Sequence, residues 1–472
     1  MRTHRVVVPT VTVLCLGAIL LSLVTMSADD AVGWRTDGTG YYPDATPPTE
    51  WSTDTNVLWA TPMPDWSNSG AVIVGNRLFT CVEPTTLLCA DTESGEILWQ
   101  ASNNYEEIAP ADELADMQQR QAECDALRKQ IGEVSKNFRQ VRKKLQDDAD
   151  NAGLKAQLDK LKKQLADLNK RLAPYNETWY VLPTKHNSNG YASATPLSDG
   201  QYVWAVFGTG VVVCYDLEGN RQWAIPLEKP KQGYGHSASL VLADGKLIVH
   251  IVNLTALEPE TGEIIWQQPL QPSWGTPAVT RIGEVEVIIT AAGSIAKAED
   301  GQVLAKQVSR LTYCSPIVHQ DVVYFIEHEK DVARAIKLPT SVEEPFEPEV
   351  LWQSKPKKDR YYASPIYHDG LLYAVTRAGI FSVIDPETGE VIYEKNLTLG
   401  KGTVYPSVTY AGGLLFVSND SGNTAIIEPG RQYSEVARNS LEHFRGCPVF
   451  IADRMYIHGF ENLYCISEAG GE

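Results

Sequence analysis

The sequence predicts an all-β fold, namely an eight-bladed β-propeller of four-stranded blades with an inserted antiparallel α-helical (coiled-coil) hairpin. Three observations lead to this prediction. A strand-rich unit recurs along most of the chain, each unit ends in an acidic turn followed by an aromatic residue, and one stretch with helical periodicity separates the first two units. The 472-residue chain is 43% apolar and holds 11 Trp and 21 Tyr, which is ample material for a large core.

The repeat is clear in residues 363–394, ASPIYHDGLLYAVTRAGIFSVIDPETGEVIYE, where three β-type runs are separated by Gly and by the turn DPETG. Equivalent units begin at Ala71, Pro196, Ser239, Pro277, Pro316, Pro365, Pro406 and Pro448. Successive starts lie about 41 residues apart, except that 125 residues separate the first two. A four-stranded unit of this length is typical of a propeller blade.

The end of each unit supports the same fold. The acidic residue and Gly of sequences such as IDPETGEVIY (384–393) suit a tight turn between a third and a fourth strand. The aromatic residue that follows is placed to wedge between neighbouring blades. These blade-docking aromatics are Trp59, Trp99, Trp223, Trp266, Trp352 and Tyr393.

The first and last units predict how the ring closes. The last unit has only three strands and stops near Cys465, whereas the run NVLWATP (56–62) precedes the first unit as an unpaired fourth strand. We therefore expect residues 57–60 to complete the last blade and remove its free edge.

The pattern of a small residue with Pro, then G-x-x-Y, then D-x-x-T-G-x-x-x-W resembles the quinoprotein-type (PQQ-like) β-propeller repeat. That repeat occurs in quinone-dependent alcohol and glucose dehydrogenases. It also occurs in the non-catalytic propeller subunit of the outer-membrane β-barrel assembly machinery (BamB-like), which this chain resembles most in kind. The likeness covers residues 56–104 and 180–468, and it implies a fold rather than one function.

The insertion, residues 105–178, has a different pattern. Apolar residues step by three and four from Leu127 to Leu145 and again from Leu154 to Leu172, with the breaker DDADNAG (147–153) between them. Such seams predict two helices folded back on each other. Either the seams bury each other in a self-sufficient hairpin, or the hairpin serves to dimerise the chain or to dock a partner.

The N-terminus predicts export. Arg2 and Arg5 precede an apolar stretch from Val6 to Val24, so we expect residues 1–28 to be a signal peptide or an uncleaved N-terminal anchor, and the protein to be periplasmic or associated with the cell envelope. Residues 29–55 form an N-terminal extension, residues 56–104 the closing strand and first blade, and residues 179–472 the remaining blades.

Charge and cysteine content restrict the partners and the redox chemistry. The net charge of −18 disfavours nucleic acid, and an envelope protein or a polysaccharide is the expected partner. Cys81 and Cys89 flank TCVEPTTLLCA symmetrically, so a hairpin centred on Thr85 could bring them opposite each other as a disulfide. Two buried free thiols are the alternative.

A ligand site is expected at the channel mouth, where the segments that feed the inner strands converge. Nearly all of these segments carry an aromatic residue, and several carry polar ones. Aromatic rings there could stack a flat ligand or a sugar, or grip a peptide, or they could merely seal the funnel between blades. The candidate residues are Trp66, Asn189, Tyr191, Tyr234, His236, Trp274, Tyr313, Arg360, Tyr361, Tyr405 and Arg445.

No catalytic constellation is recognisable: the sequence lacks G-x-S-x-G, H-E-x-x-H and C-x-x-C. It also lacks the adjacent-cysteine pair that accompanies the repeat in cofactor-using relatives. We therefore expect no metal, no cofactor and a non-catalytic binding or assembly scaffold of the cell envelope. The alternatives are a divergent dehydrogenase dependent on pyrroloquinoline quinone (PQQ) and calcium, with Arg360 and Arg445 holding the quinone carboxylates, and a carbohydrate-binding propeller.

Overall fold

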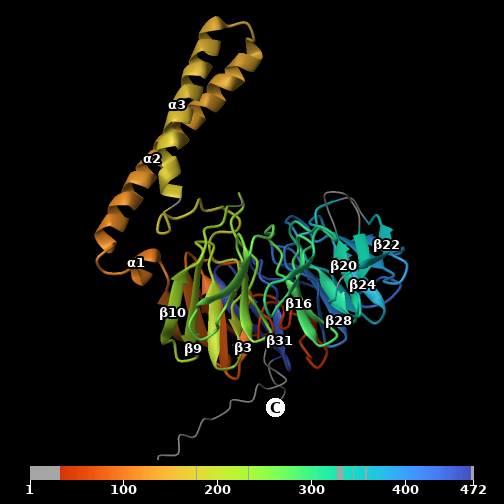
Figure 1. Cartoon of the computed structure of the whole chain (residues 1–472). Helices are drawn as coiled ribbons and strands as arrows, with labels where there is room; N and C mark the ends of the chain where they lie inside the picture. Colours follow the sequence, from red (N-terminus) through yellow and green to blue (C-terminus); the bar gives the residue numbers. More distant parts are fainter. Residues whose placement is uncertain are drawn as a thin grey trace, which may run out of the picture.

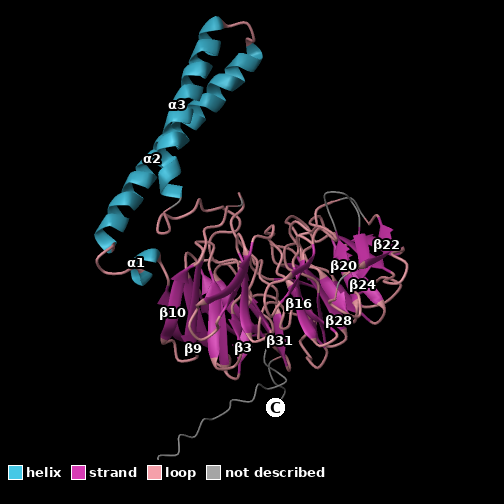
Figure 2. Cartoon of the chain, in the orientation of Figure 1, coloured by secondary structure: helices cyan, strands magenta, loops and turns pink. Residues whose placement is uncertain are grey.

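Eight blades, each of four antiparallel strands, make up the propeller in the computed structural model of the chain, which Figure 1 shows from the side. The structure describes residues 32–176, 178–231, 233–326, 333–343, 345–356 and 359–468. The predicted eight-bladed propeller with its helical insertion is confirmed, and Figure 2 shows the helices projecting beyond the β-structure. The expected signal or anchor, residues 1–28, lies outside the described residues. Within the described ranges, none of the helices combines the length and the apolar character that crossing a membrane requires.

The first four blades run from the channel outwards in chain order. The first is β3 (Val72–Val74), β4 (Arg77–Val82), β5 (Thr86–Asp91) and β6 (Ile97–Ser102). The second is β7 (Leu197–Ser198), β8 (Tyr202–Val206), β9 (Val211–Asp216) and β10 (Arg221–Pro226). The third is β11 (Val241–Ala243), β12 (Lys246–His250), β13 (Leu254–Leu257) and β14 (Ile264–Gln268). The fourth is β15 (Ala278–Ile282), β16 (Val285–Ile289), β17 (Ile295–Lys297) and β18 (Val303–Ala305).

The other four blades complete the ring. The fifth is β19 (Ile317–His319), β20 (Val322–Ile326), β21 (Ala333–Lys337) and β22 (Glu349–Ser354). The sixth is β23 (Ile366–His368), β24 (Leu371–Val375), β25 (Ile380–Ile384) and β26 (Val391–Asn396). The seventh is β27 (Thr409–Ala411), β28 (Leu414–Ser418), β29 (Asn423–Glu428) and β30 (Ser434–Ser440). The eighth is β31 (Val449–Ile451), β32 (Arg454–His458), β33 (Asn462–Ile466) and β2 (Val57–Pro62).

Burial explains the pattern of apolar and polar residues along the strands. The second and third strands of each blade are covered on both faces by neighbouring blades, so runs such as VVVC (211–214) are continuously apolar and fully buried. The outer strands alternate between partly buried and exposed positions, as in β6. In the eighth blade β2 pairs antiparallel with β33, with Thr61 opposite Leu463, which is the place that the sequence predicts for the closing strand.

The aromatic residues at the unit ends connect successive blades by one repeated contact. The indole of Trp99 donates a hydrogen bond to the Leu217 carbonyl (3.0 Å), and Trp352 donates to the Pro386 carbonyl (2.8 Å). Each indole covers the turn glycine of the next blade, such as Gly389, where a Cβ would lie 2.4 Å from the ring. Trp59, Trp223 and Trp266 make equivalent bonds to Thr92, Pro259 and Ala298. Tyr393 packs against the sixth and seventh blades, but its hydroxyl has no partner within the described chain.

The N-terminal extension has a role that no sequence pattern indicated. Its strand β1 (Tyr41–Tyr42) pairs parallel with β27, the innermost strand of the seventh blade, so the extension lies against the channel. The buried Arg35 donates hydrogen bonds to the carbonyls of Val408 (2.7 Å) and Pro365 (3.2 Å). Residues 32–39 line a cavity of about 440 Å³ together with inner-strand residues of the second to fifth blades, so the extension lies along the inner strands at the base of the channel.

The insertion contains the short α1 (Tyr105–Ile108) and two long helices, α2 (Leu114–Asp147) and α3 (Ala152–Asn176), which pack against each other. At about 1.5 Å per residue, the 34 residues of α2 span about 51 Å. All twelve predicted seam residues are buried or partly buried, whereas most other positions are exposed. Met117 and Cys124 join the core cluster between the first and second blades, which anchors the base of the hairpin.

Of the two alternatives for Cys81 and Cys89, the structure has the buried free thiols rather than the disulfide. The hairpin between β4 and β5 is centred on Pro84 rather than Thr85, so Cys81 lies opposite Leu87 and Cys89 lies opposite Phe79. Both thiols are free and fully buried, and burial raises the pKa of each to about 12. At neutral pH they are therefore protonated core side chains.

Candidate functional site: the channel mouth

A belt of hydroxyl side chains forms the throat of the channel. At the start of a blade, a backbone N–H donates to the Ser or Thr hydroxyl of the next blade, as from Thr195 to Ser239 (3.0 Å) and from Ser364 to Ser407 (2.9 Å). Equivalent bonds run from Gly70 to Thr195, from Ser239 to Thr276, from Ser315 to Ser364 and from Ser407 to the Cys447 thiol. Near six of the unit starts, a small residue thus accepts a hydrogen bond that connects two blades.

Above this belt, aromatic side chains from successive blades form a continuous arc around the mouth. The rings of Trp274 and Tyr313 stack with centroids 5.3 Å apart, and those of Tyr362 and Tyr405 stack at 5.0 Å. Edge-on contacts join His186 to Tyr234 (4.9 Å), Tyr234 to Trp274 (5.5 Å) and Tyr313 to Tyr362 (4.8 Å). The Arg445 guanidinium extends the arc by lying over Tyr405 at 4.8 Å and over Phe460 at 5.3 Å.

Belt and arc enclose a cavity of about 330 Å³ at the channel mouth. Seven of the predicted residues line it: Asn189, Tyr234, Trp274, Tyr313, Arg360, Tyr405 and Arg445. They come from connections between the outer strand of one blade and the inner strand of the next, as expected for a propeller. The structure therefore brings together most of the candidate residues.

Four candidates lie outside this cavity, which corrects the prediction. Tyr361 is 1% exposed and points into the core, and its neighbour Tyr362 lines the cavity instead. His236 is buried, and desolvation lowers its pKa to about 4. Tyr191 is buried and donates to the Pro183 carbonyl (2.6 Å), and Trp66 packs against Phe460 beside the cavity.

Several other residues line the cavity although no sequence pattern indicated them. Trp34 comes from the N-terminal extension, and His186 and Ser188 come from the segment that returns from the hairpin. Asn68 lies three residues before Ala71, which starts the first unit. Tyr362 could have been predicted from the pair YY (361–362). Adjacent side chains on an extended segment point to opposite sides, so one of the two rings must face the channel when the other faces the core.

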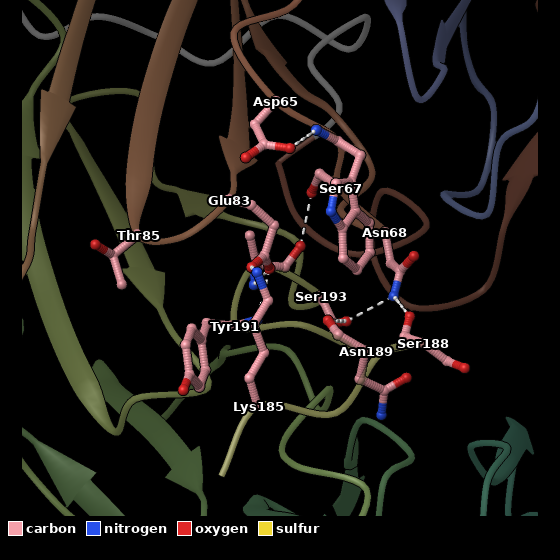
Figure 3. Close-up of polar contacts among 12 residues, drawn as sticks. Asp65, Ser67, Asn68, Glu83, Thr85, Lys185, Ser188, Asn189, Tyr191 and Ser193 are labelled. Carbon is pink, nitrogen blue, oxygen red and sulfur yellow. Dashed lines mark hydrogen bonds and ion pairs between the residues drawn. The ribbon is translucent and has the colours of Figure 1, made fainter. Parts of the chain in front are cut away.

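A buried carboxylate holds the returning segment in place (Figure 3). Glu83 accepts hydrogen bonds from the backbone N–H groups of Tyr191 and Ala192 and pairs with the Lys185 ammonium (2.6 Å). Asn68 donates to the Ser188 carbonyl (2.7 Å) and to the Ser193 hydroxyl (2.8 Å). The wall of the mouth formed by residues 186–193 is therefore fixed by polar contacts with the first blade.

The two arginines of the mouth differ in their surroundings. Arg445 donates to the Ser188 carbonyl (2.7 Å) and reaches Asp420 at 3.4 Å, so its charge is largely matched. Arg360 is exposed and donates to the Tyr362 hydroxyl (3.2 Å), which raises the pKa of the guanidinium. No acidic residue is among those that line the cavity in the described chain, so the mouth is locally positive on an acidic protein.

These residues do not fit the calcium-bound quinone of the dehydrogenases. Calcium prefers carboxylate oxygens, and the lining residues supply none. Across the described ranges, no three His, Cys, Asp or Glu residues are grouped so that they could hold a metal ion. The mouth offers rings, hydroxyls, amides and two guanidinium groups, which suit binding by stacking and hydrogen bonding.

Comparison with solved structures shows the same fold at low sequence identity. BamB from Moraxella catarrhalis is 10% identical, with a TM-score of 0.51 over 88% of this chain and 98% of that chain. The quinohemoprotein alcohol dehydrogenase from Comamonas testosteroni is 9% identical, with a TM-score of 0.57 over 94% and 81%. The computationally designed Ika8 protein is 8% identical, with a TM-score of 0.52 over 87% and 99%.

A search of curated proteins finds no match. A family profile does match, over residues 208–472, which is more than half of the chain. Its description is outer membrane protein assembly factor BamB, and the matched region runs from the outer half of the second blade (β9 and β10) through every later strand of the propeller. The chain therefore belongs to the PQQ_2 family of BamB-like β-propellers.

Proposed function

We propose that this protein is an exported, non-catalytic propeller that acts as a binding or assembly scaffold in the cell envelope, holding its partner on the face that carries the channel mouth. One observation carries the proposal. The aromatic arc and the helical hairpin are both built into connections from an outer strand to the next inner strand, so they share one face. Figure 1 shows the hairpin projecting from one face of the propeller. A partner bound there could contact both.

The base of the hairpin is tied to the wall of the mouth. On α2, Arg128 donates to the Leu182 carbonyl (2.7 Å) and Gln121 accepts from the Leu182 N–H (3.2 Å). Tyr180 donates to Asp116 of the same helix (2.9 Å). Because residues 186–193 follow directly and line the mouth, the hairpin is held in a defined position beside the cavity, as a two-point docking surface requires.

The cell envelope is proposed as the location on two grounds. The N-terminal sequence has the pattern of a secretion signal or anchor. The family is described by a component of outer-membrane protein assembly. That description suggests a protein partner, whereas the chemistry of the mouth also suits a polysaccharide.

Photo-crosslinking in cells tests the scaffold role. A photoreactive phenylalanine analogue replaces Tyr234 at the mouth, Arg139 on the hairpin, or Glu387 in an exposed turn on the opposite face. We expect discrete, reproducible adducts from the first two positions and none from the third. Equal labelling at all three positions, or none at the mouth and hairpin, contradicts the proposal.

Calorimetric titration with PQQ, with and without calcium, tests the enzyme alternative. The cavity lining predicts no calcium-dependent binding, because it provides no carboxylate. One site per chain that appears only with calcium would overturn the non-catalytic proposal.

A further inference from the structure

We infer that the channel mouth binds an acidic oligosaccharide, that is, a sugar chain carrying carboxylates, through the aromatic arc and Arg360. This inference rests on the proposed scaffold function and names the ligand class of its mouth. It draws on three features: the kind of side chains in the lining, the buried polar atoms left without partners, and the distribution of charge.

The lining has a composition that suits sugars. Its side chains are Trp, Tyr, His, Ser, Thr, Asn, Arg and Cys, with Gly, and no aliphatic side chain is among them in the described chain. A peptide anchor such as Leu or Phe gains affinity from an apolar pocket, which this lining does not offer. A sugar presents hydroxyls along its edges and C–H groups on its faces. Its faces can therefore stack on the rings of the aromatic arc while its hydroxyls bond to the hydroxyl side chains of the throat belt.

Three lining residues have buried polar atoms with no hydrogen-bond partner in the described chain. These are the Asn68 carbonyl oxygen, the Ser315 hydroxyl and the Arg445 Nε. Ser315 is 3% exposed, and its backbone N–H is already used in the throat belt. Buried polar atoms are normally paired, so an acceptor, a hydroxyl and a donor left open in one cavity indicate a ligand that both donates and accepts. Sugar hydroxyls do both.

The charge of the mouth selects an acidic sugar. Arg377 is paired with Asp359 (2.9 Å) and Arg445 with Asp420 (3.4 Å), whereas Arg360 has only the Tyr362 hydroxyl among its described hydrogen-bond partners. Arg360 thus leaves a positive charge at the rim of the arc. A guanidinium binds a carboxylate through parallel hydrogen bonds, which favours a uronate over a neutral sugar. The net charge of −18 of the whole chain disfavours nonspecific binding of acidic polymers.

The test uses the full mature chain, calorimetry, and a galacturonic acid hexamer as the probe. The matched neutral probe is the same hexamer with its carboxylates methyl-esterified. We expect one site per chain for the acidic hexamer and at least about tenfold weaker binding of the ester, because the contact with Arg360 is lost. Equal affinity for both probes overturns the assignment of an acidic sugar.

Variants locate the site. Arg360→Gln should weaken binding of the acidic hexamer about tenfold. The matched control Arg281→Gln makes the same charge change at an exposed residue of the fourth blade, outside the mouth, and should have no effect. Ser315→Ala should weaken binding without lowering the melting temperature, because its hydroxyl has no partner to lose. Equal effects of Arg360→Gln and Arg281→Gln overturn the inference.

The outcomes separate this inference from the scaffold proposal. If the folded protein gives no heat with either hexamer while crosslinks form at Tyr234 and Arg139, the sugar inference is wrong and the scaffold proposal stands. If the acidic hexamer binds as expected but no crosslink forms, the mouth is a glycan site and the proposed protein scaffold is wrong.

Discussion

Replacement of Trp352 tests the contact that connects the blades. Its side chain is 8% exposed and lies between the fifth and sixth blades, with its indole N–H 2.8 Å from the Pro386 carbonyl. Trp352→Ala removes a large buried side chain, so we expect the free energy of unfolding to fall by about 3–5 kcal/mol. Trp352→Phe keeps most of the ring and leaves the carbonyl unpaired, so its cost should be about 1–3 kcal/mol.

Gly389, the turn glycine that the Trp352 ring covers, allows a sharper test of this contact. Gly389 has a φ of +73°, and an added Cβ would lie 2.4 Å from the Trp352 ring. Gly389→Ala in the native background therefore combines backbone strain of about 1–2 kcal/mol with a steric clash. Combined with Trp352→Ala the clash disappears and only the strain remains. The two substitutions should thus cost less together than the sum of their separate costs, by at least about 1 kcal/mol.

The measurement is urea unfolding followed by circular dichroism in the β-sheet band. Tyr234→Ala is the control, because that ring is 46% exposed and should change stability little. The reasoning is refuted if Trp352→Ala costs no more than Tyr234→Ala, or if the costs at Trp352 and Gly389 simply add within about 0.5 kcal/mol.

Three further predictions concern the core, pH and the insertion. Glu83→Gln should lower the free energy of unfolding by about 2 kcal/mol, because it removes the buried carboxylate that pairs with Lys185 and accepts from the backbone of Tyr191 and Ala192. The same change should loosen residues 186–193, which faster amide hydrogen exchange there would show. His236 and His458 are buried, and desolvation lowers the pKa of each to about 4, so the unfolded chain binds more protons than the folded chain below pH 6.5. The free energy of unfolding should therefore fall by up to about 1.4 kcal/mol per pH unit and per imidazole between pH 6.5 and 4, measured from urea unfolding at each pH. Removing the hairpin tip, residues 139–158, with a short Gly-Ser turn should leave the melting temperature unchanged, whereas Met117→Asp at its base should lower it by several degrees because Met117 belongs to the propeller core.

The fold could be predicted because its signals are local and repeated. The turn Asp and Gly, the Trp that follows, and the small residue at each unit start recur at fixed spacing, and each makes the same contact in several blades. The heptad-like steps of the insertion likewise correspond to a real seam between α2 and α3. Periodic patterns of this kind can be recognised in the sequence without any knowledge of tertiary contacts.

The candidate site was predicted less well, because its geometry depends on single contacts between distant residues. Trp34 reaches the mouth only because Arg35 bonds carbonyls of the sixth and seventh blades more than 300 positions away. Nothing in the N-terminal extension matches the repeat, so no spacing rule could place it. Which of Tyr361 and Tyr362 lines the cavity depends on which ring packs into the core between the blades. At the β4–β5 hairpin, a shift of the turn by one residue is enough to place Cys81 opposite Leu87 instead of Cys89.

The N-terminal extension also decides how the mouth can be used. Trp34 lines both the mouth cavity and the cavity at the channel base, together with Thr276 and Ser315 of the throat. The mouth is formed by connections from an outer strand to the next inner strand, so it opens on the face that also carries the hairpin. A partner docked across that face would therefore cover the bound ligand. Sugar binding and partner docking should then depend on each other, either by competing for the mouth or by the partner trapping the ligand beneath it.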